Sequence, residues 1–414
     1  MNRLLLAFCI CASAVAVAQS KPHDVDLTAS DGTHLKATFY PAATNAKSAP
    51  AVMLLHMCNT DRKSWMPVAE QLAAAGIGAL TMDNRGFGES SGPRFQDATP
   101  EVQREVRDKW PGDFDTALNW LLSQPGVDKN RVGAGGGSCG VNNVVNLAIR
   151  HPEIRSLVLL AGAVDPTALT YLQRNAWIPL FTSAAGDDEY ISDAPQLMQW
   201  FAELTGNPRN RFIGFKDGRH GTEIFGPHPE LPKQIVAFYV DTLEKEPATA
   251  NAKFMPKPTL ASQFWAAASE PGGSARAAQI FYEARKHDPN AFVFPEAMLN
   301  VLAYERLQAG GVHVAGFDLP TQKPSSPSAR DVAQAKSDAL MLFKLNAEAY
   351  PQSANTQDSL ADAYLLNGQK AEALAAEQKC LELLPNDKNN DQFKAQLRQA
   401  AEEKIAKLKG SKGD

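Results

Sequence analysis

The stretch RVGAGGGSCG at residues 131–140 decides how this chain is expected to fold. Its first half is the pattern of a short buried strand, and the apolar spacing that follows, up to Arg150, is that of a helix. Ser138 stands between them, with Gly136 two residues before it and Gly140 two residues after it. Glycine has no Cβ, so two backbones can approach closely there. The pattern predicts a strand, a sharp turn and a helix, with the Ser138 hydroxyl exposed at the end of the strand.

A glycine-rich phosphate loop is the alternative interpretation of this string. That loop requires a different glycine spacing and a lysine directly after its last glycine. Val141 occupies that position here. The nucleophile turn is therefore the favoured interpretation.

Short apolar runs and helix-like stretches alternate on both sides of this motif, from His23 to about Leu243. The strand-like runs are residues 51–55, 77–81, 131–135, 156–160 and 178–182. The helix-like stretches are residues 64–75, 100–123, 141–150 and 194–204. This alternation predicts a mostly parallel sheet with helices on both faces. Residues 25–39 predict an opening hairpin that turns at Asp31 and Gly32.

A serine nucleophile needs a general base, and the base needs an acid that orients it. Asp187 and Asp188 follow the strand 178–182, and His220 follows a strand-like run at residues 212–215. Both segments are expected at the same edge of the sheet as Ser138. Asp165, after the preceding strand, is a more distant candidate for the acid.

Three further stretches resemble the α/β-hydrolase family, closest to its dienelactone-hydrolase and esterase or acyl-peptidase branches. They are residues 55–65, 83–90 and 112–128. The resemblance covers about 220 residues and implies an α/β-hydrolase sheet whose catalytic residues follow in the order Ser138, Asp188, His220. Asp188 is preferred over Asp187 because the family's acid commonly precedes a Val or Ile by three residues, and Ile191 stands there.

Dienelactone hydrolases often use cysteine as the nucleophile, which makes Cys139 an alternative to Ser138. For Cys139 to occupy the centre of the motif, residue 141 would have to be glycine, but it is Val141. Ser138 has the required glycine on both sides. The resemblance therefore points to Ser138.

The family's oxyanion hole consists of two backbone N–H groups, and Cys139 is expected to supply one of them. The other belongs to the turn at residues 56–59, where the family usually has His-Gly and this chain has Met57 after His56. Cys58 is the preferred donor and Met57 the alternative, while His56 is expected to brace the turn. If Cys58 and Cys139 both donate, their Cα atoms lie within about 7 Å, which is within disulfide range. We hypothesise that they are bonded; two packed thiols are the alternative.

The chain changes character near residue 246. Residues 246–259 are expected to form a linker, and residues 260–409 a helical domain that resembles a short tetratricopeptide array. A spacing of 4, 3 and 5 residues recurs three times and ends at Pro289, Pro351 and Pro385; the last two lie 34 residues apart. Generic helical hairpins are the alternative interpretation. A short stretch near Val312 is the one part of this region whose pattern could be that of a strand. Because so short an array has little stability of its own, we expect it to dock onto the catalytic half.

Residues 1–18 have the pattern of a secretory signal: an early Arg3, a short apolar run and a small-x-small site ending at Ala18. A membrane anchor is the alternative, but the run is shorter than the roughly 20 residues that a spanning helix needs. Removal would leave Cys58, Cys139 and Cys380. We expect a secreted or periplasmic protein with no membrane span after removal, and a catalytic domain over residues 23–245.

The composition and motif spacing argue against several classes of function. The chain has 414 residues, 44% of them hydrophobic, and a net charge of −5, which argues against a large nucleic-acid surface. No Cys/His cluster has ligand spacing, so neither a metal nor an organic cofactor is implied. Only residues 163–177 separate two central strands, so no large cap is expected there. We expect an exported serine hydrolase for small esters; the alternatives are a peptidase on short or acylated peptides, and an interaction protein that binds partners through its helices and has a vestigial hydrolase half.

Overall fold

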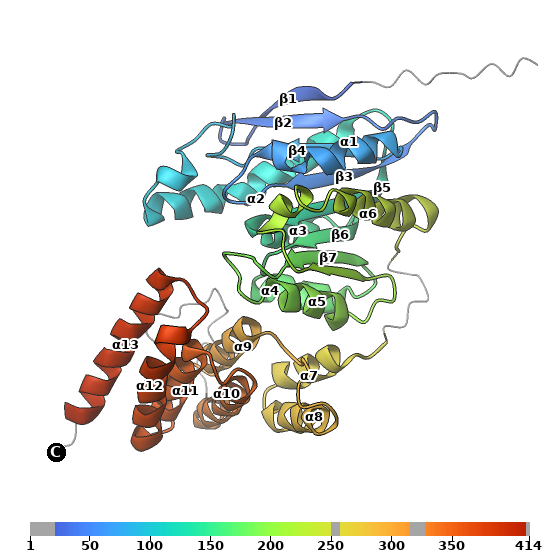
Figure 1. Ribbon diagram of the computed structural model, residues 1–414. Helices are drawn as coiled ribbons and strands as arrows, with labels where there is room; N and C mark the ends of the chain where they lie inside the picture. Colours follow the sequence, from blue (N-terminus) through green and yellow to red (C-terminus); the bar gives the residue numbers. More distant parts are fainter. Residues whose placement is uncertain (1–20, 250–256, 315–327, 411–414) are drawn as a thin grey trace, which may run out of the picture.

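The computed structural model describes residues 21–249, 257–314 and 328–410. Within the first range, eight strands form one sheet in the order β1-β2-β4-β3-β5-β6-β7-β8 (Figure 1). The strands are β1 (His23–Thr28), β2 (His34–Tyr40), β3 (Ala49–Leu55), β4 (Gly78–Met82), β5 (Val127–Gly137), β6 (Ile154–Leu160), β7 (Leu180–Ala185) and β8 (Arg211–Phe215). Neighbours from β4 to β8 pair in parallel, and β2 pairs antiparallel with β1 and β4. The predicted mostly parallel sheet is confirmed.

The antiparallel edge begins with the predicted hairpin. Gly32 has a φ of 84°, which a residue without Cβ adopts without strain, and its amide donates to the Ala29 carbonyl at 2.9 Å. The turn aligns Val25 with Ala37, and both side chains are buried on one face of the sheet. This alternation of buried and exposed residues sets the register of the edge.

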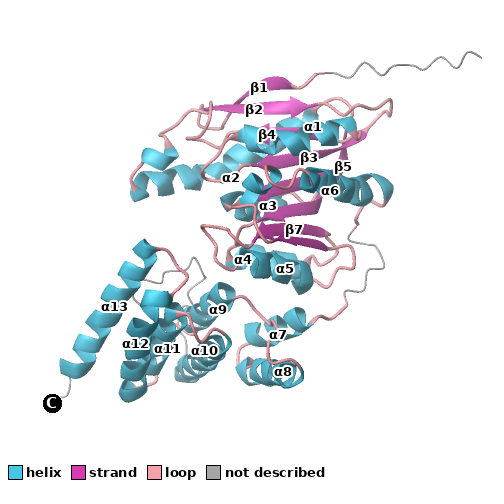
Figure 2. Ribbon diagram, in the orientation of Figure 1, coloured by secondary structure: helices cyan, strands magenta, loops and turns pink. Residues whose placement is uncertain are grey.

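Helices cover both faces of the sheet (Figure 2). They are α1 (Met66–Ala74), α2 (Pro100–Ser123), α3 (Cys139–Arg150), α4 (Pro166–Arg174), α5 (Ala194–Leu204) and α6 (Glu230–Tyr239). Val52 and Leu54 of β3 pack with α1 and α6, whereas Met53 and Leu55 pack on the other face with α2 and α3. Side chains of a strand alternate between faces, so one apolar strand serves two cores.

Two local features bear on the site. The expected helix at residues 64–75 begins later, because residues 62–65 form the 3-10 turn η1 (Arg62–Trp65) and Pro67 then occupies the first turn of α1. Between β6 and β7 the chain forms the single short helix α4. The absence of a large cap at that point is therefore confirmed within the described residues.

The described elements after residue 259 are all helical. They are α7 (Leu260–Ser269), α8 (Ser274–His287), α9 (Glu296–Ala309), α10 (Ala329–Ala349), α11 (Ala354–Leu366), α12 (Lys370–Leu383), the short η5 (Leu384–Asn386) and α13 (Asp391–Gly410). The expectation of a strand near Val312 is wrong for that residue. Its amide instead donates to the Leu307 carbonyl at 2.8 Å and closes the carboxyl end of α9.

The recurring sequence spacing marks equivalent helices. Pro289, Pro351 and Pro385 each follow the second helix of a pair: α8, α10 and α12. The alanines at the start of each repeat, Ala277, Ala339 and Ala373, are fully buried. Paired helices therefore explain the self-similarity, and the tetratricopeptide resemblance stays a prediction.

The helical half packs against the sheet domain through α5. The Trp200 ring of α5 lies 4.9 Å from the Trp265 ring of α7, edge to face, and both side chains are buried. Beside them the Thr259 hydroxyl donates to the Glu203 carbonyl at 2.9 Å. One apolar cluster runs from β6 and β7 through α5 into α7–α10. The expected docking of the two halves is confirmed.

Parts of two sequence expectations lie outside the described residues. These are the signal segment 1–18 and, within the predicted linker, residues 250–256. Among the helices that the structure describes, none has both the length and the apolar character required to cross a bilayer.

Truncating the aromatic contact between the halves should cost stability. We expect Trp265→Ala to lower the free energy of unfolding by about 3–5 kcal/mol, because a large buried side chain leaves a cavity. Urea unfolding should then show the helical half separating before the sheet domain. Tyr282→Ala, at an exposed aromatic on α8, is the control and should cost less than about 1 kcal/mol. Equal losses in the two variants would contradict the docking role of Trp265.

A buried charge cluster joins the last three helices. Lys404 Nζ of α13 lies 2.6 Å from Asp362 and 2.9 Å from Asp358 on α11, and 3.1 Å from Glu377 on α12. Three carboxylates share one ammonium group. Burial raises the pKa of Glu377 to about 8, and the neighbouring Asp358 adds to the shift.

This cluster makes stability depend on pH. The ordinary pKa of Glu377 is 4.5, so between about pH 4.5 and 8 the folded state holds a proton that the unfolded state has lost. The free energy of unfolding that Glu377 contributes is therefore fully present below about pH 4.5 and is lost as pH rises through about 8. We expect Glu377→Gln to gain unfolding free energy relative to the unmodified protein as pH rises from 5 to 8.5. The exposed Glu382→Gln on the same helix should show no such trend, and a pH-independent difference for Glu377→Gln would refute the assignment.

Candidate active site

Ser138 occupies the turn between β5 and α3. Its φ of 54° and ψ of −123° are rare for a residue with a Cβ and cost on the order of 1–3 kcal/mol. Its amide donates to the Leu160 carbonyl of β6 at 2.9 Å, which fixes the turn to the sheet. The strain is thus held by the strands on which the turn sits.

The two glycines of the motif are required by backbone contacts. A Cβ on Gly136 would lie 2.1 Å from the Gly140 carbonyl oxygen, and a Cβ on Gly140 would lie 2.6 Å from the Leu55 carbonyl oxygen. Real Cβ atoms do not approach that closely. Helix α3 therefore starts directly against the end of β3, and the predicted strand, turn and helix are present.

His220 and Asp188 lie in loops that follow β8 and β7. His220 Nδ1 is 2.7 Å from Asp188 Oδ2, and both side chains are almost fully buried. Asp188 Oδ1 accepts the amides of Tyr190 and Ile191, each at 2.9 Å. Three donors thus converge on the Asp188 carboxylate. Nδ1 then carries the imidazole proton, and Nε2 is left as an acceptor.

The alternative acids have other contacts. Asp187 Oδ1 accepts the Arg219 amide at 2.8 Å, and Arg219 has a φ of 61°. Asp187 therefore holds the bend directly before His220 and does not hold its ring. Asp165 caps α4 by accepting the Ala168 amide at 2.9 Å. Of the three candidates, Asp188 is the one placed on the imidazole.

The loop of His220 meets the turn of Ser138 through Gly221. A Cβ on Gly221 would lie 3.7 Å from the Ser138 amide nitrogen and 2.2 Å from Met57 Sδ. The Met57 side chain is fully buried against Gly137, and its sulfur accepts the Thr222 amide at 3.3 Å. Met57 thus fills space beneath the site, a role that sequence analysis missed. In the sequence, the glycines at positions 137 and 221 were the only indication that a large side chain packs there.

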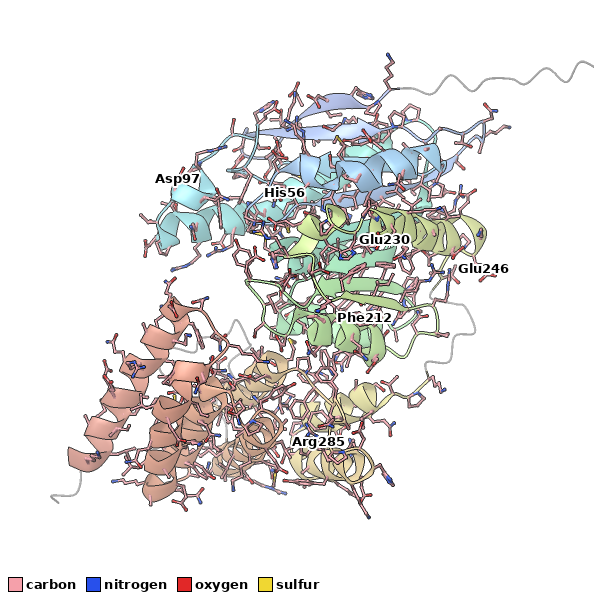
Figure 3. All side chains as sticks on the ribbon, in the orientation of Figure 1. His56, Asp97, Phe212, Glu230, Glu246 and Arg285 are labelled. Atoms are coloured by element: carbon pink, nitrogen blue, oxygen red, sulfur yellow. A yellow bond between two sulfur atoms is a disulfide. The ribbon has the colours of Figure 1, made fainter. Side chains whose placement is uncertain are left out.

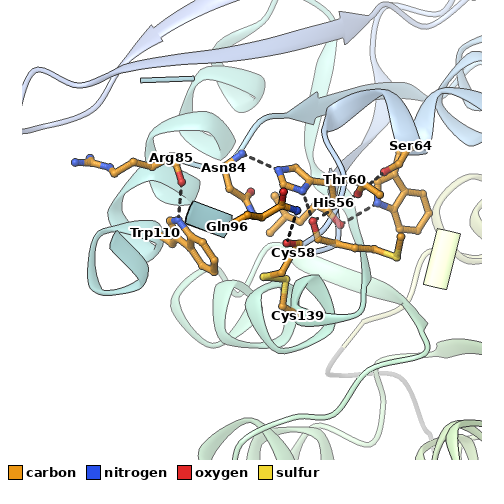
Figure 4. The surroundings of a disulfide bond; sticks show 12 residues. His56, Cys58, Thr60, Ser64, Asn84, Arg85, Gln96, Trp110 and Cys139 are labelled. Atoms are coloured by element: carbon orange, nitrogen blue, oxygen red, sulfur yellow. Dashed lines mark hydrogen bonds between the residues drawn. A yellow bond between two sulfur atoms is a disulfide. The ribbon is translucent and has the colours of Figure 1, made fainter. Parts of the chain in front are cut away.

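Cys58 and Cys139 form a disulfide with a Cα–Cα distance of 5.9 Å (Figure 4). The hypothesised bond is therefore present in the structure. Within the described residues, the amides of Met57, Cys58 and Cys139 donate no hydrogen bond. Two free donors beside one turn are what an oxyanion hole requires, although which of Met57 and Cys58 donates stays a prediction.

His56 braces this turn. Its Nε2 accepts the Asn84 amide at 2.9 Å, so Nδ1 is the protonated nitrogen and donates to the Met57 carbonyl at 2.6 Å (Figure 4). Complete burial lowers the pKa of His56, which keeps the ring neutral. In Figure 3, His56 lies toward Asp97 and away from Glu246, on the side of the sheet where the parallel strands end.

Arg62 anchors the far end of the same turn. Its side chain is almost fully buried, and its amide donates to Asp83 Oδ1 at 2.7 Å. Its guanidinium pairs with Asp83 and, at 2.9 Å, with Glu89. The turn between residues 56 and 62 is thus held at both ends by buried polar contacts.

A cavity of about 460 Å³ lies beside this turn. It is lined by residues 59–61, 64, 86–88 and 94–97. Tyr190 is 61% exposed, and its ring lies 4.7 Å from the His220 imidazole. The exposed Tyr190 ring therefore borders the imidazole of His220.

One group of side chains in the described residues has the proximity that metal ligands need. Ligand atoms of Asp358, Glu377 and Cys380 lie within 4.8 Å of one another. Lys404 Nζ already sits 2.9 Å from Asp358 and 3.1 Å from Glu377, so the ammonium group neutralises this cluster. It lies in the helical half and not among the residues around Ser138.

The chain is similar to a known protein family and to individual known proteins. Residues 50–251 match the family model described as the alpha/beta hydrolase fold. An uncharacterized 31.7 kDa protein of Escherichia coli is 26% identical over 213 residues, which is 49% of this chain and 68% of that protein. A thiohydrolase of Aspergillus aculeatus is 28% identical over 145 residues, 35% of this chain and 42% of the relative, so the chain spans less than half of that enzyme.

An esterase of Pyrococcus furiosus is 20% identical, with a TM-score of 0.43, and the match covers 54% of this chain and 93% of the esterase. The sheet order, the turn at Ser138 and the family match to residues 50–251 agree with one another. The half of this chain that precedes the helical region has the α/β-hydrolase fold.

Proposed function

We propose that this protein is a serine hydrolase that cleaves carboxylic esters through Ser138, Asp188 and His220. The observation that carries the proposal is the 2.7 Å contact between His220 and Asp188, in a loop that adjoins the strained turn of Ser138. A nucleophile, a base and an orienting acid need this order of contacts. Strain at a solvent-facing serine serves no packing purpose, which supports a chemical role.

The proposed reaction is acyl transfer to water. His220 Nε2 takes the Ser138 proton as the serine oxygen attacks the ester carbonyl carbon. The negative oxygen that develops is stabilised by the amides of Cys139 and of Cys58 or Met57. The C–O bond to the alcohol then breaks, and the alcohol leaves with the proton from His220. A water molecule repeats the sequence on the acyl-enzyme and releases the acid.

Asp188 acts on the charge of the imidazole. Once His220 has taken the proton, the ring is positive and lies against an ionised carboxylate with little solvent around it. Coulombic attraction in such surroundings is stronger than in water, so the imidazolium is stabilised as it forms. The amides of Tyr190 and Ile191 hold the carboxylate in place during this step.

The surroundings of Ser138 suggest the class of substrate. Between β6 and β7 the chain forms only the short helix α4, so no large cap is inserted at that point. The cavity of about 460 Å³ beside the turn at residues 56–62 lies within the usual range for small-molecule sites. Asp61, Arg94 and Asp97 make its lining polar. Esters of modest size fit these features better than long-chain lipids. Thioesters are the second candidate class, because one relative is a thiohydrolase.

The proposal extends to the whole chain. We assign residues 1–18 to a removable signal, residues 23–245 to the catalytic domain and residues 260–409 to a tetratricopeptide-like domain with a protein partner. A periplasmic or secreted location is supported by the Cys58–Cys139 disulfide, since such bonds persist in oxidising compartments.

Covalent labelling tests the nucleophile. A fluorophosphonate should label the protein, and Ser138→Ala and His220→Ala should each abolish labelling, because the first removes the nucleophile and the second removes its base. Ser192→Ala, at an exposed serine in the loop of Asp188, is the matched control and should label normally. Folded protein that takes up no label would contradict the proposed function. Turnover of short p-nitrophenyl esters but not of aminoacyl amides separates an esterase from a peptidase.

The two neighbouring aspartates give a paired test of the acid. We expect Asp188→Asn to lower kcat for a short p-nitrophenyl ester by up to about 10⁴-fold with little change in KM, because the imidazole loses its orienting charge. Asp187→Asn keeps an oxygen that can accept the Arg219 amide and should lower kcat by less than about 10-fold. Equal losses in the two variants would show that Asp188 has no special role.

A further inference from the structure

We infer that the Cys58–Cys139 disulfide positions the oxyanion hole, so that the rate of hydrolysis depends on the oxidation state of this bond. The inference rests on the proposed function and names a determinant of the same site. It concerns two residues whose backbone amides are proposed to bind the oxyanion, while their side chains form the disulfide.

The bond joins a rigid element to a loop. Cys139 directly follows Ser138 and is the first residue of α3, so the helix and the sheet fix its amide. Cys58 lies in the middle of the turn at residues 56–62, outside any helix or strand. The disulfide keeps the two Cα atoms 5.9 Å apart. It therefore sets the distance between a fixed donor and a donor on a loop.

Other contacts hold the ends of the turn more firmly than its middle. His56 and Met57 are buried on one side, and Arg62 is buried on the other. Between them, Asn59 is exposed, and Gln96 Nε2 reaches the Cys58 carbonyl only at 3.5 Å. The Thr60 hydroxyl contacts Ser64 at 3.4 Å. Among the contacts of the described residues, the disulfide is the strong restraint on Cys58 (Figure 4).

Breaking the bond should therefore disturb one donor without unfolding the domain. His56, Met57 and Arg62 keep their buried partners, so the fold and the adjoining cavity persist. The oxyanion exists only near the transition state. Loss of its fixed donor then lowers kcat and leaves KM almost unchanged.

A dithiol reagent can reduce the Cys58–Cys139 disulfide. Both cysteines are partly exposed, so a thiolate of dithiothreitol can attack one sulfur and form a mixed disulfide. The second thiol of the reagent closes its ring and releases the protein, which gains two electrons and two protons as the thiols of Cys58 and Cys139. Cys380 is buried, and burial raises its pKa to about 12, so its thiol does not take part in exchange.

The experiment compares the oxidised and reduced full chain. Tryptic mapping without reductant should find residues 48–62 linked to residues 132–150. After treatment with dithiothreitol, kcat for a short p-nitrophenyl ester should fall at least 10-fold, with about 10²–10³-fold as the limit for losing one donor. KM should stay within about 2-fold, the circular dichroism spectrum should not change, and oxidised glutathione should restore kcat.

Two variants separate positioning from other effects. The double variant Cys58→Ala/Cys139→Ala should have the low kcat of the reduced protein and should not respond to dithiothreitol. Cys380→Ala is the control and should keep both the full kcat and the response to reductant, because Cys380 lies in the helical half.

The outcomes are distinct. An unchanged kcat after complete reduction, unlinked peptides, or a loss of kcat that accompanies unfolding would each overturn the inference and leave the proposed function intact. An oxidised protein that neither hydrolyses the ester nor takes up fluorophosphonate overturns the proposed function, and the positioning role with it.

Discussion

The contact between the start of α3 and the end of β3 is the constraint on which the site depends. Gly140 lies against the Leu55 carbonyl so closely that no Cβ fits, and Gly136 lies equally close to Gly140. Between these glycines Ser138 has a strained backbone conformation, and the hydrogen bond from its amide to the Leu160 carbonyl of β6 ties that turn to the sheet. Close packing beneath Ser138 therefore holds the turn that carries its hydroxyl.

Around Ser138, polar contacts fix loops that carry no regular structure, and those of His56 and Arg62 are buried. His56 and Arg62 anchor one loop through backbone amides and a carboxylate, while Asp187 holds the loop of His220. In each case the hydrogen-bond partner lies in a different loop from the group itself, after another strand of the sheet. Because an unpaired buried polar group is costly, the contacts of His56 and Arg62 make their loop resist rearrangement.

The helical half was partly predictable. The recurring prolines and buried alanines located the second helix of each pair, because a helix pair buries the same positions in every repeat. The region near Val312 was misjudged: an apolar residue after a helix fits a strand pattern, yet here it ends α9. Nor did sequence periodicity reveal the Trp200–Trp265 contact, since the two residues come from different halves of the chain.

By itself, the sequence determined the parallel sheet, its opening hairpin, the turn at Ser138 and the short list of acids, because these follow from local periodicity and from glycine at defined positions. Only the tertiary structure decided that Asp188 contacts the imidazole, that Asp187 holds the preceding bend and that Met57 fills the space under the site. The resemblance to the family favoured Asp188 through its spacing to Ile191, but that spacing does not show which aspartate contacts the imidazole. What separates the two aspartates is the direction of each side chain in a loop, and that is set by partners more than thirty residues away.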